Sequence, residues 1–219
     1  EYRQGDDLRR VHWRSSARTG DLMVRREEQP WQSRATLLID NRLLSHRGQG
    51  IASSLEAAVG VTASVAVHLS QRGFAVRLVS AGGEDQANAW HLRDSTLNTG
   101  PLLEALAVLQ TDNRSRMDST WMGEASQGGL TIAVFGALDQ HDVPLLRRVA
   151  HHTTSAMAFA LDVDAWAGGG RASSGSAPVL TSAGWRAVTL GPQDRMDNAW
   201  EELGRMGSAR GLSTPVGRG

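Results

Sequence analysis

The feature that most constrains the fold of this chain is an alternation of short apolar runs with longer amphipathic stretches. Residues 35–40 form an apolar run that ends in Asp40, as expected of a buried parallel strand. Similar runs predict strands over 74–79, 130–135, 156–161 and 185–190, with an edge strand over 88–92. Strands that alternate with helices form right-handed βαβ units. The sequence therefore predicts an α/β domain with a mostly parallel sheet that helices cover on both faces.

The clearest helix signal lies between residues 53 and 73. Ser53 and Glu56 have the spacing of a capping box, and Gly73 provides a stop at the C-terminal end. Small residues dominate this stretch, and the residues expected on its inner face are Leu55, Val59, Ala63, Ala66 and either Leu69 or Ser70. Three more helices are expected to begin at Thr99, Asp142 and Asp194.

Composition divides the chain into three parts. Residues 1–33 are charged and rich in arginine, residues 34–206 carry the alternating pattern, and residues 207–219 are rich in Gly, Ser, Arg and Pro. We expect a short segment packed on one α/β domain, followed by a disordered tail. Because the chain begins at Glu1 in charged sequence, we also expect it to be a fragment of a larger protein.

Composition also narrows the function. The chain has no cysteine, which excludes disulfides, thiolate metal sites and thiol nucleophiles. Its net charge is zero, with 23 basic residues (all arginine) and 23 acidic ones, so nothing in the overall charge points to nucleic acid. The longest apolar run covers residues 57–69, well short of the roughly 20 residues of a membrane helix. We therefore expect no nucleic-acid partner and no membrane span in this part of the chain.

The first 25 residues carry a specific motif. It reads Tyr-x-x-Gly-Asp-x-x-Arg-x-Val-His-Trp, then Ala-Arg-x-Gly-x-Leu-x-Val-Arg. This closely resembles the signature of the bacterial family called domain of unknown function 58. The residues in register are Gly5, Asp6, Arg9, His12, Trp13, Ala17, Arg18, Gly20, Leu22 and Arg25.

The resemblance implies a fold and a setting. Members have a von Willebrand A-like (Rossmann-like) three-layer αβα domain after the signature. They resemble membrane-anchored proteins with two N-terminal membrane helices, are often encoded beside MoxR-type AAA+ ATPases, and have no established catalytic activity. The resemblance therefore implies a non-enzymatic, cytoplasmic module of a membrane-anchored protein. Its partner would be a MoxR-type ATPase, in protein assembly or maturation.

A von Willebrand A domain binds magnesium through Asp-x-Ser-x-Ser after its first strand, with a Thr and an Asp from two other loops. Here the strand ends in Asp40, but Arg42 and Leu44 replace the two serines, while Thr99 and Asp139 are the candidates for the other loops. An arginine repels a dication, so we expect no metal and no other cofactor. We hypothesise that Arg42 takes the place of the metal and pairs with Asp40 or Asp139. The simpler alternative is an arginine in a solvated loop.

Other residue patterns leave alternatives open. His151 and His152 are adjacent, so on a helix they diverge too far to share a metal well, and His141 near Asp139 is a weak metal cluster. A metal-dependent adhesion-type binder, or a hydrolase using Asp40, Asp139 and a histidine, remains an alternative. The leading hypothesis is a protein-interaction module that binds through the loops after Asp40, Thr99 and residue 135.

Overall fold

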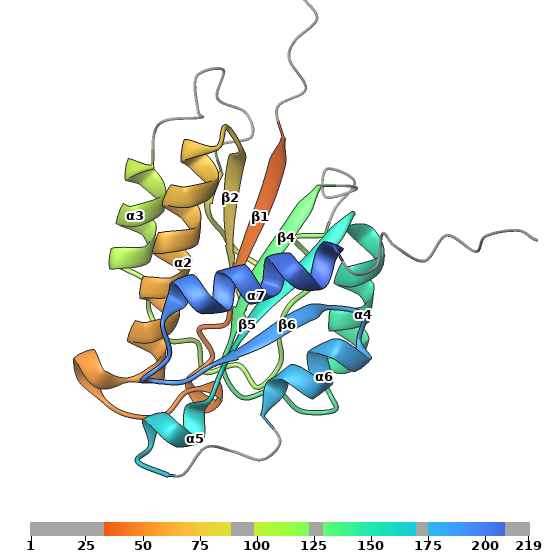
Figure 1. Cartoon of the computed structure of the whole chain (residues 1–219). Coiled ribbons are helices and arrows are strands. Elements are labelled where there is room, and N and C mark those ends of the chain that lie inside the picture. The colour runs from red at the N-terminus through yellow and green to blue at the C-terminus, as the bar shows by residue number, and fades with distance from the viewer. Residues whose placement is uncertain (1–32, 89–98, 123–128, 170–174, 209–219) are drawn as a thin grey trace, which may run out of the picture. The chain divides into compact units, whose positions relative to one another are not determined.

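The computed structural model describes residues 33–88, 99–122, 129–169 and 175–208 (Figure 1). The chain divides into two units, Glu1–Gln32 and Ser33–Gly219, and every described residue lies in the second unit. The signature segment and the expected disordered tail therefore fall outside the described residues, and the three-part domain division stays a prediction.

A six-stranded sheet forms the centre of the second unit, in the order β3-β2-β1-β4-β5-β6. Its strands are β1 (Arg34–Ile39), β2 (Ala75–Ser80), β3 (Asp85–Asn88), β4 (Leu130–Phe135), β5 (Ser155–Leu161) and β6 (Arg186–Leu190). All neighbours pair in parallel except β3, which runs antiparallel to β2. The predicted α/β class with a mostly parallel sheet is confirmed.

Helices cover both faces of the sheet, as Figure 1 shows. The helices on one face are α2 (Ser54–Gln71), α3 (Gly100–Ala107) and α7 (Met196–Ser208), and those on the other are α4 (Val143–His152) and α6 (Ser176–Ser182). The short helix α5 (Val163–Trp166) follows β5, and two 3-10 helices, η2 (Leu43–Ser45) and η3 (Gly50–Ala52), lie between β1 and α2. No helix in the described ranges is both long and apolar enough to cross a membrane.

Two apolar cores form because successive side chains of a strand point to opposite faces. On β1, Leu37 and Ile39 belong to the core under α2, whereas Leu38 belongs to the core under α4. In the second core Trp185 is almost fully buried, and its indole N–H donates to the backbone oxygen of Leu146 at 2.9 Å. Because helices cover both faces of the sheet, every residue of β1 after Arg34 is buried, which explains why the strand reads as an unbroken apolar run.

Helix α2 begins as predicted, since the Ser53 side chain accepts a hydrogen bond from the backbone N–H of Glu56 at 3.2 Å. The prediction of its inner face was only partly right. Ala66 and Leu69 are buried, together with Ala58, Val61 and Val65, but Leu55, Val59 and Ala63 are only partly buried. The buried face of α2 is therefore rotated from the predicted one, and it includes the polar residues Ser54 and Thr62, which an apolar pattern does not mark.

The structure differs from the sequence-based prediction at one strand and two short helices. The predicted edge strand over 88–92 begins earlier, as β3 at Asp85, and residues 89–92 lie outside the described residues. Helices α5 and α6 were not predicted, since their sequences are too short to show helical periodicity.

Candidate functional site

The candidate site lies where the strand order reverses, at the carboxyl ends of β1 and β4. In open α/β sheets the loops diverge at this point and ligands bind there. Asp40 directly follows β1, and its backbone N–H donates to the oxygen of Val134 on β4 at 2.9 Å. The Asp40 side chain is completely buried, so its carboxylate needs a partner inside the protein.

Arg42 is that partner. Its Nε lies 2.9 Å from Asp40 Oδ1 and its Nη2 lies 2.9 Å from Asp40 Oδ2, which is a two-pronged ion pair. The Arg42 side chain is only 4% exposed, although it sits in a loop. The predicted pairing of Arg42 with Asp40 is therefore present, and Arg42 is not a solvated loop residue.

A second carboxylate completes the cluster. Asp142, directly before α4, accepts from Arg42 Nη1 at 2.9 Å and from Nη2 at 3.3 Å. Arg42 Nη1 also donates to the backbone oxygen of Ser115 at 3.1 Å. These bonds use all five N–H groups of the guanidinium. We call Asp40, Arg42 and Asp142 the Arg42 cluster.

The two carboxylates favour the charged form of the Arg42 guanidinium. Burial alone would lower its pKa, but the hydrogen bonds and charge of Asp40, and then the charge and hydrogen bonds of Asp142, outweigh burial and hold the pKa of Arg42 above its ordinary value. One cation faces two carboxylates, which leaves a formal charge of −1. Backbone N–H groups of Arg42 and Asp139 donate to these carboxylates, and the N-terminus of α4 adds favourable dipoles near Asp142.

The segment that follows α3 closes over this edge. Asn41 donates from Nδ2 to the Gln110 backbone oxygen at 2.7 Å and accepts from the Ala81 N–H at 3.1 Å. The backbone of Asp112 pairs with Asn41 and Leu43, forming a short parallel bridge. The Arg42 cluster is thus buried under a hydrogen-bonded loop.

Hydrogen bonds hold the end of η2 close to the carboxyl ends of β1 and β4. His46 lies 2.5 Å by Nε2 from the backbone oxygen of Asp40 and 3.0 Å by Nδ1 from Ser54 Oγ. The Ala137 N–H donates to the Ser45 backbone oxygen at 2.8 Å. This approach requires Gly136, because a Cβ there would lie 2.1 Å from that same Ser45 oxygen.

Two predicted site residues lie elsewhere. Asp139 is exposed and pairs with His141 at 3.3 Å, and its pKa is lowered because it accepts the backbone N–H of His141. The second carboxylate on Arg42 is therefore Asp142, and the prediction of Asp139 was wrong. Thr99 precedes α3, whereas the end of α3 leads to Gln110 beside Asn41. The eight residues of α3 rise about 12 Å, so the placement of Thr99 at this edge was also wrong.

Asp142 was read from the sequence as a helix cap. Its position two residues before Pro144 is typical of a cap, yet its side chain makes no capping bond in α4. A cap and a buried ion-pair partner look the same in sequence at this position. The carboxylate was therefore missed as a site residue.

The residues of the cluster do not suit a divalent cation. The four carboxylate oxygens of Asp40 and Asp142 all accept hydrogen bonds from N–H groups, and a guanidinium already lies between them. Within the described residues, no group of three or more His, Asp or Glu side chains is arranged to hold a metal. The hydrolase alternative is not supported, since Asp139 lies outside the buried cluster and Asp40 is inaccessible.

The outer surface of the same edge carries exposed apolar side chains. Leu43 and Leu44 on η2 are 51% and 66% exposed, Ile51 on η3 is 98% exposed, and Val108 at the end of α3 is 69% exposed. We call these four residues the apolar rim. Single exposed apolar residues are normal, but four on the loops of one edge are the kind of feature that marks an interaction site.

The sheet order and the strand-terminal aspartate define the class of protein, a von Willebrand A-like α/β domain with an arginine in the metal-site loop. The comparison with solved structures finds the VWA domain of SpRpn10, with 14% identity and a TM-score of 0.45, covering 86% of this chain and 98% of that one. It also finds the PilB minor pilin from Streptococcus sanguinis, with 7% identity and a TM-score of 0.46, covering 84% of this chain and 64% of that one.

The family described as "Protein of unknown function DUF58" matches residues 1–109. This match confirms the resemblance carried by the N-terminal motif. No curated protein matches the chain.

Proposed function

We propose that this domain is a non-enzymatic protein-interaction module that binds a protein partner through the apolar rim. The observation that carries the proposal is the exposure of Leu43 and Leu44, which directly follow the buried Arg42, together with that of Ile51 on the next 3-10 helix of the same loop. Burying these side chains against a partner would stabilise a complex by roughly 1.5–3 kcal/mol each before the cost of association.

The Arg42 cluster has a structural part in this proposal. It fixes the loop that carries Leu43 and Leu44, and Arg42 supplies the positive charge that a metal ion supplies in related domains. A metal-dependent domain can gain or lose its cation, whereas Arg42 is covalently part of the chain. The rim is therefore ready to bind at all times.

The partner and the setting rest on the family resemblance alone. On that basis we propose a MoxR-type AAA+ ATPase as the partner and protein assembly or maturation as the process. The domain would then be the cytoplasmic part of a membrane-anchored protein. The comparisons name no partner for this chain.

Introducing a charge on the apolar rim is expected to weaken the complex strongly. Leu44→Asp and Ile51→Asp should each weaken binding by about 30-fold or more, because hot-spot side chains at an interface contribute about 2 kcal/mol or more. The measurement is co-purification and calorimetry with the proposed partner, a MoxR-type ATPase, with and without nucleotide. Leu103→Asp is the control, since Leu103 on α3 is also exposed, at 37%, but lies outside the rim. Unchanged binding by both rim variants would refute the rim as the docking surface.

Calorimetry with magnesium tests the proposed role of Arg42. The wild-type protein is expected to give no binding heat at millimolar magnesium or manganese. The double variant Arg42→Ser, Leu44→Ser recreates Asp-x-Ser-x-Ser over residues 40–44 and leaves two carboxylates without their cation. This variant is expected to bind magnesium and to melt at a higher temperature in its presence. Binding by the wild-type protein would instead favour the metal-dependent alternative.

A further inference from the structure

The sheet ends at a strand, β6, whose outer edge has no neighbouring strand among the described residues. β6 pairs with β5 alone, in an unbroken parallel register from Arg186 to Leu190. Figure 1 shows this edge strand between α7 on one face of the sheet and α6 on the other. What the edge can bind therefore depends on the groups that point outward from β6 and on these two helices.

Two residues of β6 present their backbone groups at the outer edge. The N–H of Asp162 donates to the backbone oxygen of Leu190 at 3.0 Å, so the backbone groups of Leu190 face β5. Because successive strand residues direct these groups to opposite sides, Val188 also faces β5, whereas Ala187 and Thr189 face away from it. In the part of the chain that the structure describes, no hydrogen bond is found for the N–H or C=O groups of Ala187 and Thr189. These groups therefore need water or another chain as their partner.

Solvent reaches this edge. Ala187 is 8% exposed although its side chain lies in the second core, whereas Ala158 and Ala160 on the neighbouring strand β5 are 0% exposed. Alanine has no side-chain atom beyond Cβ, so the position of Ala187 at the edge explains the difference. Thr189, on the same face of β6, is half-buried. The outward backbone groups therefore lie in a narrow strip that solvent reaches.

Edge strands usually carry features that prevent another strand from pairing with them. The other edge strand, β3, has four residues, an irregular register with β2, and Asp85 at its start. β6 has no proline and no irregularity of register, and its one charged side chain, Arg186, donates to Ser155 Oγ on β5 and so turns toward the sheet. Of the two edges, β6 is the one that is open to an added strand.

The hand of the crossovers disfavours a strand supplied by the chain itself. Helices α4 and α6 connect successive parallel strands and lie on one face of the sheet, whereas α7 follows β6 on the other face. A further parallel strand beside β6 would need a crossover of the opposite hand after α7, which is rare. A strand beside β6 is thus expected to come from another molecule.

A second copy of this domain does not fit beside β6. Both α7 and α6 pack on this strand. Paired strands lie about 4.8 Å apart, whereas a helix with its side chains is about 10 Å wide. Two copies joined through β6 would therefore force their α7 helices into the same space. A single extended peptide adds only a strand and avoids this overlap.

The rotation of α7 places one carboxylate beside the free edge. Helix α2 packs on β1, β2 and β4, and Trp200 of α7 contacts His68 of α2 with ring centroids 5.0 Å apart. Trp200 therefore marks the side of α7 that faces the middle of the sheet. With 3.6 residues per turn, Glu202 lies about 160° around the helix from Trp200, on the side toward the outer edge of β6. Glu201 lies about 160° from the buried Leu203, on the solvent side.

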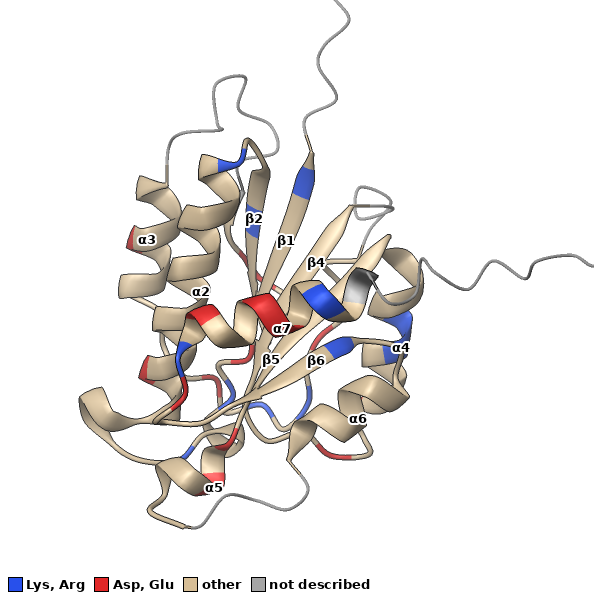
Figure 2. Ribbon diagram, viewed as in Figure 1, with Lys and Arg blue, Asp and Glu red and all other residues tan. Residues whose placement is uncertain are grey.

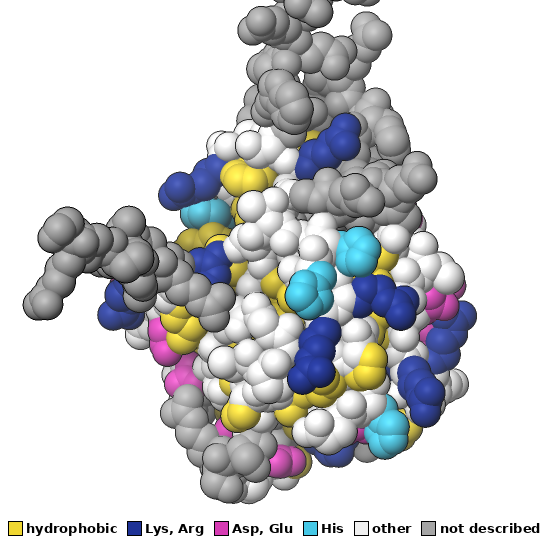
Figure 3. Space-filling view, turned by 90° about the vertical axis from the view of Figure 1, so that its right-hand side faces the viewer, with side chains coloured by type: hydrophobic (Ala, Val, Ile, Leu, Met, Phe, Trp, Pro, Cys, Tyr) yellow, Lys and Arg dark blue, Asp and Glu magenta, His cyan; other side chains and the backbone are white. Residues whose placement is uncertain are grey.

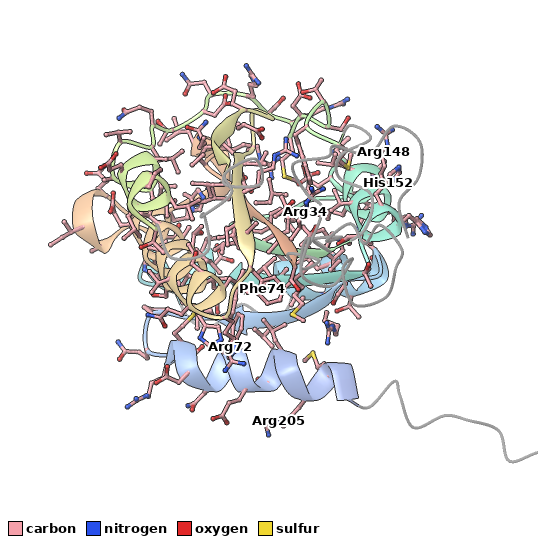
Figure 4. All side chains as sticks on the ribbon, turned by 90° about the horizontal axis from the view of Figure 1, so that it is seen from above. Arg34, Arg72, Phe74, Arg148, His152 and Arg205 are labelled. Atoms are coloured by element: carbon pink, nitrogen blue, oxygen red, sulfur yellow. The ribbon has the colours of Figure 1, made fainter. Side chains whose placement is uncertain are left out.

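The charge of Glu202 is available to a ligand. Among the described residues, none of the ion pairs involves Glu202. Figure 2 marks acidic residues along α7 and a basic residue near its end, Arg205. The Arg205 side chain points away from the sheet in Figure 4, and its Nε donates to the backbone oxygen of Glu201 at 3.4 Å. A cation beside β6 on the α7 side would therefore meet an exposed carboxylate.

The other side of the edge is uncharged. Figure 3, which faces α4 and α6, shows basic and histidine side chains that include those of α4, whereas α6 itself has no charged residue. Side chains of an added strand alternate between the two faces. Those on the α6 side would lie beside Ala187 and Thr189, where uncharged β-branched side chains pair well. Those on the α7 side would lie near Glu202.

We propose that β6 binds an extended peptide of a partner protein as an added strand, with basic side chains facing α7 and uncharged side chains facing α6. In such complexes backbone hydrogen bonds provide affinity, and the alternating side chains provide specificity. The inference goes beyond the proposed function, because it concerns a lateral edge of the sheet and not the apolar rim.

A short peptide of alternating valine and lysine, added to the full chain, tests the proposal. Calorimetry should detect binding at millimolar peptide or below. Hydrogen exchange should slow at the amides of Ala187 and Thr189, since both would donate to the peptide. The N-methylated form of the same peptide has no backbone donors and should bind at least tenfold more weakly. Absence of binding, equal binding of the N-methylated peptide, or protection of other amides without these two would each overturn the proposal.

The charge on the α7 side is tested by Glu202→Lys, which should weaken binding of the valine–lysine peptide about fivefold or more, the effect of an exposed ion pair. The matched control is Glu201→Lys, which makes the same change of charge on the solvent side of the same helix and should bind as the wild-type protein does. Thermal unfolding verifies that both variants remain folded. An equal loss of binding in the two variants would contradict the placement of basic side chains beside Glu202.

Discussion

Replacing Arg42 with methionine is expected to lower the free energy of unfolding by about 3–5 kcal/mol, the usual result of removing one partner of a buried ion pair. Methionine keeps most of the length of the side chain but provides no cation. Asp40, fully buried, and Asp142, 5% exposed, would then lie close together without the guanidinium that separates them. Desolvation and mutual repulsion of the two carboxylates both destabilise the folded state.

Thermal and denaturant unfolding measure this loss. For a domain of this size, 1 kcal/mol corresponds to about 2–4 °C, so the melting temperature should fall by roughly 10 °C. Because the pKa of Arg42 is raised, its contribution is fully present below the ordinary arginine pKa, and the loss should be the same at pH 6 and pH 8.

The control for Arg42 is Arg114→Met. Arg114 is 53% exposed and its Nε lies 3.7 Å from Asp112 Oδ2, so removing it should cost less than about 1 kcal/mol. If Arg42→Met were as mild as this control, the cluster would not stabilise the loop as we argue.

The pairing of Arg42 with Asp40 was predictable from local sequence. A buried strand ending in aspartate places that carboxylate at the carboxyl edge of the sheet. An arginine two residues later, beside no other acid in the loop, is within reach of it. The separation in sequence is short, so no knowledge of the tertiary fold was needed.

The placement of Thr99 was not predictable in the same way, because it depends on the direction of one strand. Had β3 been parallel, the segment after it would have started at the carboxyl edge. The strand is antiparallel, so the chain emerges at the other end and α3 runs back toward Asn41. A four-residue strand gives no sequence signal for its direction.

The choice between Asp139 and Asp142 also required the fold. Both carboxylates lie in the turn that leads from β4 into α4, three residues apart. The backbone N–H of Asp139 donates to Asp142 at 3.2 Å, which turns the Asp142 carboxylate inward, while Asp139 itself stays exposed. Such a turn is set by hydrogen bonds that residue types alone do not reveal.

The carboxyl edge of the sheet buries the charges of the Arg42 cluster and presents the apolar side chains of Leu43 and Leu44 in the same loop. The rigidity of this edge depends on how closely the loop after β1 approaches the end of β4. Gly136 allows that approach, since a Cβ there would lie 2.1 Å from the Ser45 backbone oxygen, and its carbonyl accepts from Ser176 Oγ at 2.8 Å.

Gly136→Ala is expected to lower the free energy of unfolding by about 2–4 kcal/mol and to weaken partner binding through the apolar rim. The new methyl group would lie 2.1 Å from the Ser45 backbone oxygen, so η2 must move away and lose the 2.8 Å bond from the Ala137 N–H. Unfolding and partner-binding measurements on the same variant test both effects. Gly60→Ala is the matched control: its Cβ meets nothing within 4 Å on α2, so it should stabilise the protein by about 0.5–1 kcal/mol. Equal stability of the two variants would show that η2 yields without cost, and the rim would then not be the rigid surface that docking requires.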